Sequence, residues 1–166
     1  MISLVALIGK NRELGRKGDL CWRLKSDMEY YLGATRGKKL LVGKRTFDSM
    51  PLYPRGSYVY VLNTELFRPR RKNPAQEAQT EVVTDLAEFV DKYKDREEEV
   101  VVIGGASVYA QVLPFAKKMY LNEVEAEDEA ADVFFPELDN GEWDVITVNA
   151  GEENGIRYRQ NVYTRK

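Results

Sequence analysis

The stretch from Glu99 to Pro114 constrains the fold of this chain more than any other. It begins with a β-branched run, residues 100–103, whose lack of polar alternation is typical of a strand buried on both faces of a parallel sheet. Gly104 and Gly105 follow at the carboxyl end, where open α/β sheets bind ligands and glycine lets phosphates approach backbone N–H groups. A helix starting near Ser107 would direct its positive dipole end into the same space. The stretch predicts a central strand and a nucleotide-binding turn; the alternative is a tight turn that binds nothing.

The composition limits the number of domains and the class of ligand. With 166 residues, 43% of them hydrophobic, the chain is long enough for one well-buried core and too short for two ordinary domains. Residues 1–83 carry 16 Lys and Arg against 8 Asp and Glu, and residues 84–166 carry 9 against 19. A basic half can hold a polyanionic small molecule as well as nucleic acid, so charge alone does not choose between them. No nucleic-acid partner is expected.

Missing residue types exclude several kinds of chemistry. The sequence has no histidine and one cysteine, Cys21, so it cannot form a Ser-His-Asp triad, a Cys-His pair, an H-E-x-x-H zinc site or an intrachain disulfide. Catalysis must therefore use carboxylates, hydroxyls or a cofactor, and no metal site is expected. The apolar segment Ile2–Ile8 is too short to span a membrane and lacks the flanks of a signal peptide. A cytoplasmic protein without a membrane partner is the expectation.

Strand and helix patterns alternate from residue 1 to Pro114, which predicts a mainly parallel α/β sheet with flanking helices. The strand candidates are Ile2–Ile8, Lys39–Val42, Tyr58–Leu62, Val82–Val83 and Met119–Val124, and helical spacing recurs at 26–32, 43–50 and 85–93. Residues 13–24 read as a long lid-like loop, and the acidic run 123–132 as a solvated turn. Two final segments, 143–148 and 156–164, predict a closing antiparallel hairpin.

A candidate acid follows the presumptive lid. Ser26 and Glu29 have the spacing of a capping box, which predicts a helix start and places Asp27 in the first turn, with Tyr31 one turn along the same face. Acids in a first helical turn commonly only complement the dipole. Asp27, however, lies beside the core-facing residues Met28 and Tyr31, and a carboxylate in apolar surroundings needs a partner.

A second junction of strand, glycine and helix lies at residues 43–46. Gly43 is followed by Lys44, Arg45 and Thr46, which provide two basic side chains and a hydroxyl at a helix start. The segment lacks the glycine and hydroxyl spacing of a Walker P-loop. It could still hold phosphates, and a solvated basic turn is the alternative.

The order and spacing of these motifs resemble dihydrofolate reductase over the whole chain. The motifs are Leu14-Gly15, Leu20-x-Trp22-x-Leu24-x-x-Asp27, Gly43-Lys44-x-Thr46-Phe47-x-Ser49-Met50, Ile103-Gly104-Gly105-x-x-x-Tyr109 and Phe135-Pro136. The resemblance implies one dihydrofolate reductase-like domain, residues 1–166, with an adenosine-binding subdomain at about residues 38–97. It also implies reduction of 7,8-dihydrofolate by hydride transfer from NADPH, antifolates as further ligands, and a monomer.

The resemblance assigns roles to individual residues. Asp27 would bind the pterin and assist its protonation, with a pKa raised by burial; Trp22 would order a water and Leu20 would close over the nicotinamide. The remaining substrate residues would be Val5, Ala6, Met28, Tyr31, Met50, Arg55, Ile103 and Asn122. The cofactor residues would be Ala6, Leu14, Gly15, Gly43, Lys44, Arg45, Thr46, Asn63, Thr64, Ile103, Gly104, Gly105, Ala106, Ser107, Val108 and Tyr109. The peptide between Gly104 and Gly105 would be cis.

The chain departs from the family pattern at three positions. Cys21 replaces a proline, Asn122 replaces the threonine that partners the catalytic acid, and Ser57 stands where an arginine grips the glutamate of folate. Arg55, two residues earlier, is the candidate replacement for that arginine. Two other functions stay open: a riboflavin-pathway pyrimidine reductase, which should place polar groups at the substrate-packing positions, and a non-catalytic nucleotide-binding relative.

Overall fold

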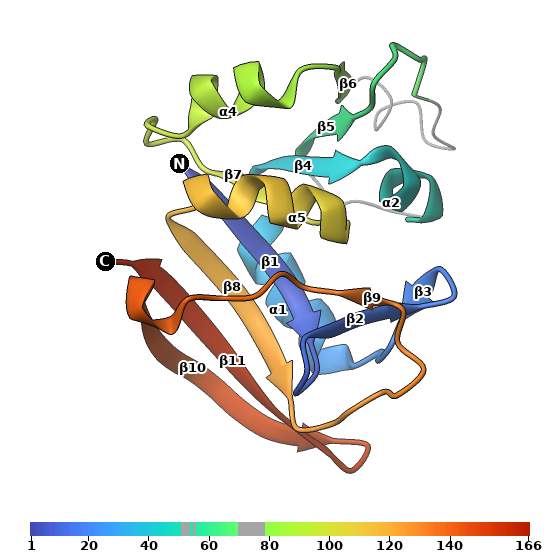
Figure 1. Ribbon diagram of the computed structural model, residues 1–166, viewed down its shortest axis with the longest axis vertical. Helices are drawn as coiled ribbons and strands as arrows, with labels where there is room; N and C mark the ends of the chain where they lie inside the picture. Colours follow the sequence, from blue (N-terminus) through green and yellow to red (C-terminus); the bar gives the residue numbers. More distant parts are fainter. Residues whose placement is uncertain (51–53, 55, 70–78) are drawn as a thin grey trace.

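One large sheet and one small sheet form the framework of the protein (Figure 1). The computed structural model describes residues 1–50, 54, 56–69 and 79–166. Within these residues the large sheet has eight strands in the order β10-β11-β8-β1-β7-β4-β5-β6. Their bounds are β1 Ile2–Ile8, β4 Lys39–Gly43, β5 Tyr58–Leu62, β6 Thr80–Val83, β7 Val100–Val102, β8 Lys118–Val124, β10 Trp143–Glu153 and β11 Ile156–Arg165.

The pairing confirms the mainly parallel sheet with a closing hairpin. Strands β8, β1, β7, β4, β5 and β6 pair in parallel, whereas β11 pairs antiparallel with both β8 and β10. The predicted central strand β7 lies between β1 and β4, and all three of its residues are fully buried. The hairpin strands are longer than expected, because pairing continues through Glu153 and Ile156 at the turn.

Helices cover both faces of the large sheet. The described helices are α1 Lys25–Thr35, α2 Lys44–Ser49, α4 Leu86–Tyr93 and α5 Ala106–Val112, with short 3₁₀ turns at Leu113–Phe115 and Asn140–Glu142. α4 and α5 share one core cluster, and α1 and α2 bury residues in the cluster on the other face. Among the described residues, no helix is long and apolar enough to cross a membrane.

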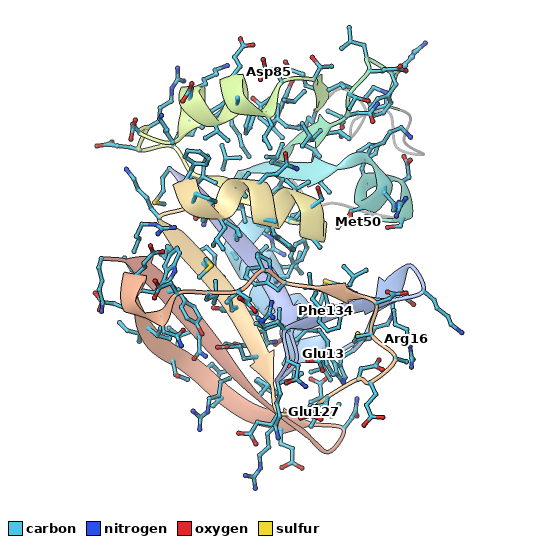
Figure 2. The ribbon with its side chains drawn as sticks, viewed as in Figure 1. Glu13, Arg16, Met50, Asp85, Glu127 and Phe134 are labelled. Carbon is cyan, nitrogen blue, oxygen red and sulfur yellow. The ribbon has the colours of Figure 1, made fainter. Side chains whose placement is uncertain are left out.

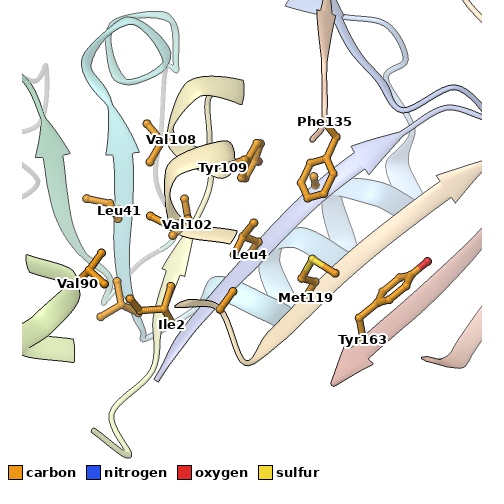
Figure 3. Close-up of a cluster of buried hydrophobic side chains, with 14 of the residues drawn as sticks. Ile2, Leu4, Leu41, Val90, Val102, Val108, Tyr109, Met119, Phe135 and Tyr163 are labelled. Carbon is orange, nitrogen blue, oxygen red and sulfur yellow. The ribbon is translucent and has the colours of Figure 1, made fainter. Parts of the chain in front are cut away.

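Alternating side chains of β1 divide the core between the two faces. Leu4 points into the cluster beneath α5, where Figure 3 shows it beside Val102 and below Tyr109. Phe135 packs against the Tyr109 ring at a centroid separation of 5.1 Å. Val5 points to the opposite face, toward α1 and α2. β1 therefore contributes to both the structural core and the face that carries Asp27.

Two local expectations were wrong. The segment 13–24 is not a structureless loop: β2 Glu13–Arg16 pairs with β3 Asp19–Leu20 and with β9 Val133–Phe134 in the small sheet. These strands are only two to four residues long, which is too short to show a period in the sequence. The capping box is also absent, because α1 begins at Lys25, one residue before Ser26, and its N-cap residue makes no side-chain cap.

Candidate active site

The carboxyl ends of β7 and β4 meet in a turn of small residues. The Gly43 N–H donates to the Gly104 carbonyl over 2.9 Å, which joins the two glycine junctions that were separate in the sequence. Gly104 has a φ of 127°, which L side chains rarely adopt, and the Gly104–Gly105 peptide is cis, as the resemblance implied. A Cβ at Gly105 would lie 3.1 Å from the Thr46 hydroxyl oxygen. A ligand's phosphates can therefore approach the backbone of this turn closely. The turn formed by Gly43, Gly104 and Gly105 is called the cradle below.

Helix α5 leads out of this cradle and ties it to β1. It begins at Ala106, one residue earlier than expected, with Ser107 exposed and Val108 buried. The Tyr109 hydroxyl donates to the Val5 carbonyl over 2.7 Å in the buried interior. Burial raises the pKa of Tyr109, so this phenol stays protonated and keeps donating. The contact holds the cofactor-side helix against the strand expected to line the pterin pocket.

The basic residues expected to bind phosphate lie on α2 at the same edge of the sheet. The Lys44 ammonium is 2.7 Å from the Asp48 carboxylate and 5.1 Å from the Phe67 ring centroid, and Arg45 is exposed. Exposed ion pairs of this spacing stabilise a protein by little, so a phosphate can compete for Lys44. The Asn63 amide donates to the Glu65 carbonyl after β5, and Thr64 beside it is exposed.

Asp27 projects from the first turn of α1 toward β8. Asn122, fully buried on β8, donates its amide N–H to the Asp27 carboxylate over 3.3 Å. Burial raises the pKa of Asp27 to about 6; the Asn122 hydrogen bond opposes this rise and the Glu153 carboxylate adds to it. The sequence-based expectation of a raised pKa is confirmed. An acid with this pKa can hold or release a proton near neutral pH.

Unsatisfied polar atoms surround Asp27. Among the described residues, the buried Tyr31 hydroxyl and the Asn122 side-chain oxygen have no hydrogen-bond partner. Burial, together with the Asp27 charge, raises the pKa of Tyr31 to about 12. Buried polar atoms normally have partners, so these two are candidates to bind a polar ligand or a water.

Apolar residues complete the expected substrate wall. Val5 and Ile103 are buried in one cluster, against which Tyr31 and Met50 pack. Ala6 is buried too, but its side chain faces the opposite core, so only its backbone can take part. Met28 is 56% exposed and therefore contributes less to this wall than expected. The structure brings together most of the predicted substrate residues on the α1 side of β1.

The predicted lid residues lie in and beside the small sheet, where Figure 2 labels Glu13 and Arg16 of β2 and Phe134 of β9. Gly15 pairs with Leu20 and with Val133, and Leu14 packs partly against the main core. Leu20 is 51% exposed. Trp22 packs so closely on Gly9 that a Cβ there would lie 2.3 Å from its ring.

Sequence reasoning missed the carboxylates that hold this lid. Glu13 is 1% exposed and accepts N–H donations from Asn11 over 2.5 Å and from Asp128 over 2.8 Å. The Asp132 carboxylate accepts from the Lys17 N–H over 3.1 Å. The acidic run 123–132 is therefore more than the solvated turn expected, because two of its residues anchor the lid. No local pattern predicts hydrogen bonds across 115 residues of chain.

The position of the missing arginine has a structural role here. Ser57 is 3% exposed and its hydroxyl donates to the Thr35 carbonyl at the end of α1 over 3.1 Å. Ser57 therefore faces into the fold and stabilises a helix end. Arg55, the predicted replacement, lies outside the described residues.

Comparison with known proteins agrees with this geometry. The family model described as "Dihydrofolate reductase" matches residues 1–165. A dihydrofolate reductase of Bacillus subtilis is 32% identical, covering 100% of this chain and 95% of the relative. A dihydrofolate reductase of Mycobacterium tuberculosis is 31% identical, with coverages of 99% and 98%.

A solved structure shares the fold. It is dihydrofolate reductase from Enterococcus faecalis complexed with NADP(H) and RAB-propyl, with a TM-score of 0.83, 21% identity and coverage of 100% of this chain and 96% of that one. The family model matches nearly the whole chain, and both relatives are more than 30% identical over almost all of it. The chain belongs to the dihydrofolate reductase family.

Proposed function

We propose that this chain reduces 7,8-dihydrofolate to 5,6,7,8-tetrahydrofolate with NADPH, and that Asp27 assists protonation of the substrate. The observation that carries the proposal is the pairing of Asp27 with Asn122 beside a buried Tyr31 hydroxyl that has no hydrogen-bond partner in the described part of the chain. The Asp27 carboxylate can accept two N–H donors of a pterin. Its pKa of about 6 lets it supply a proton near neutral pH, directly or through water.

Residues at the cradle fit NADPH. Bound NADPH supplies the hydride, whereas the chain's own residues bind and orient the cofactor and substrate and exclude water from the site. Gly43, Gly104, Gly105, Ala106 and Ser107 present backbone near the start of α5, where a pyrophosphate can approach closely.

Side chains around the cradle complete the proposed cofactor site. Lys44, Arg45 and Thr46 supply cations and a hydroxyl for the phosphates, which favours NADPH over NADH because the 2′-phosphate needs positive partners. Asn63 and Thr64 would lie near the adenosine ribose, within an adenosine-binding region at about residues 38–97. Val108 would help to wrap the pyrophosphate and Tyr109 would lie near the nicotinamide, with Ala6, Leu14, Gly15 and Ile103 completing the cofactor site.

The lid has a proposed role in excluding water. Leu20 is exposed in β3 and can close over the nicotinamide, whereas Trp22 is packed and can hold an ordered water next to Asp27. Arg55 would grip the glutamate of the substrate, since Ser57 is engaged with α1.

Loss of absorbance at the NADPH band on mixing purified protein with dihydrofolate tests the reaction. We expect turnover with dihydrofolate and none with the pyrimidine intermediate of riboflavin synthesis, and Asp27→Asn should lower the rate at pH 7 by at least ~100-fold. Turnover of the riboflavin intermediate alone would identify the pyrimidine reductase instead. Cofactor binding without turnover of either compound would indicate a non-catalytic relative, and full activity in the variant would remove Asp27 from the mechanism.

Two expectations from the sequence belong to this proposal. We expect a monomer, which sedimentation of the purified chain can test, and a cytoplasmic location, which the single cysteine fits because a reducing compartment needs no disulfide. A stable dimer in sedimentation would contradict the first.

A further inference from the structure

The start of α1, the helix that carries Asp27, is held by a residue far away in the sequence. Its own N-cap residue, Leu24, makes no side-chain cap. Glu153 supplies the missing acceptors: its carboxylate accepts the Lys25 N–H over 2.6 Å and the Ser26 N–H over 2.9 Å. Glu153 is the last residue of β10, at the tip of the hairpin, and lies 128 and 127 positions from these donors. The cap is therefore a tertiary contact.

The hairpin holds α1 at further points. The Gln160 amide on β11 donates to the Ser26 carbonyl over 3.1 Å, and the Tyr30 hydroxyl donates to the Asn161 carbonyl over 2.8 Å. These contacts therefore hold the Glu153 carboxylate in one position next to the first helical turn. Its charge acts on Asp27 from a constant position.

Two electrostatic effects of Glu153 on Asp27 have the same sign. A carboxylate near another carboxylate disfavours ionisation of its neighbour. A negative charge on a helix N-terminus also offsets the positive dipole end, which would otherwise favour ionised Asp27 in the first turn. Both effects keep the proton on Asp27 at higher pH.

We propose that Glu153 is a positioning residue for proton delivery: its carboxylate caps α1 and its negative charge favours the protonated form of Asp27. The inference rests on the proposed function, because it concerns the acid of that reaction. Glu153 contributes to the raised pKa of Asp27, after burial, and its own pKa is lowered, chiefly by the N–H donors of α1. Glu153 is therefore ionised throughout the range in which Asp27 titrates.

The other groups that face this pair do not titrate in that range. Asn122 donates to Asp27 from β8 and carries no charge. Tyr31 on α1 and Tyr109 on α5 are both influenced by Asp27, and their raised pKa values keep them neutral. Lys25, next to Glu153 on α1, helps to lower the pKa of Glu153. A shift of the Asp27 titration midpoint in a Glu153 variant can therefore be assigned to the change of charge at Glu153.

The test is a ¹³C NMR titration of the Asp27 carboxyl carbon in the full-length chain, combined with the pH profile of dihydrofolate reduction. In Glu153→Gln the Asp27 midpoint should fall by about half a pH unit, the size expected for a charge at a helix start. The reduction rate should then fall about threefold above both midpoints and match wild type below both. Glu153→Asp, which keeps the charge, should recover at least half of the shift.

The matched control is Glu152→Gln. Glu152 is the exposed neighbour whose side chain points to the other face of β10, so this variant should leave the midpoint unchanged. A lower rate at every pH with an unmoved midpoint would show that Glu153 only supports the helix, and would overturn the proposal. If no variant, wild type included, reduces dihydrofolate, the proposed function fails, while the NMR titration still decides whether Glu153 controls Asp27.

Discussion

The carboxyl group of Asp27 should make the folded state less stable at neutral pH, and Asp27→Asn should relieve this cost. The pKa of Asp27 is raised from 3.8 to about 6, chiefly by burial. Between pH 3.8 and about pH 6, the folded chain therefore keeps a proton on Asp27 that the unfolded chain releases. The stability associated with this group is therefore fully present below pH 3.8 and is lost as pH rises through about 6.

The shift sets the size of the effect. A difference of about two pKa units corresponds to ~3 kcal/mol at pH 7.5, as an upper limit because the side chain is only partly buried. Near pH 4 the same shift costs about 0.6 kcal/mol, since the folded state then keeps its proton and the unfolded state is only about 60% ionised. The stabilisation of Asp27→Asn relative to wild type should therefore be larger at pH 7.5 than at pH 4, by about 1–2.4 kcal/mol.

Urea unfolding of both proteins at pH 7.5 and pH 4.0, followed by circular dichroism, measures this difference. Comparing the two proteins at each pH cancels the titration of all other groups. A stability difference between variant and wild type that is the same at both pH values would refute the raised pKa. A variant less stable at pH 7.5 would show that the ionised carboxylate has a favourable partner in the fold.

Three further substitutions test the ligand contacts. Replacing Lys44 and Arg45 with Ala should weaken the binding of NADPH by several-fold to ~100-fold, because each charged hydrogen bond contributes ~1.5–3 kcal/mol. The binding of NADH should weaken much less. Calorimetry measures both affinities, and equal losses would place the 2′-phosphate elsewhere. Arg55→Ala should raise KM for dihydrofolate but not for a pterin without the glutamate. Equal effects on both substrates would show that Arg55 does not bind the glutamate. Gly105→Ala, whose Cβ would lie 3.1 Å from a threonine hydroxyl oxygen, should weaken NADPH about tenfold or more while Tm falls by ~4 °C or less. Gly33→Ala is the control, because nothing lies within 4 Å of its Cβ position, and an equal loss of affinity there would contradict the cradle.

Local patterns in the sequence were enough to predict the large sheet. Runs such as Val100–Ile103 are buried on both faces because β-branched residues without polar alternation suit a central parallel strand. The glycines that end β7 and β4 predicted where a phosphate could approach, and the structure joins them by one backbone hydrogen bond. Asp27 could be singled out because it lies one helical turn from Tyr31, which packs against the core, and a carboxylate in apolar surroundings needs a partner; Met28, the other residue expected to face the core, is 56% exposed.

Tertiary structure alone decided what surrounds that acid. Asn122 lies 95 positions from Asp27 and Glu153 lies 127 from Ser26, so no short-range pattern contains either contact. The apparent capping box at Ser26 and Glu29 was misleading for this reason, since the cap comes from the hairpin tip. Helix and strand periods depend on neighbours along the chain, whereas the pKa of a carboxylate depends on burial and on charges brought close by folding. The sequence therefore identified the acid, and only the folded chain determined how strongly it holds its proton.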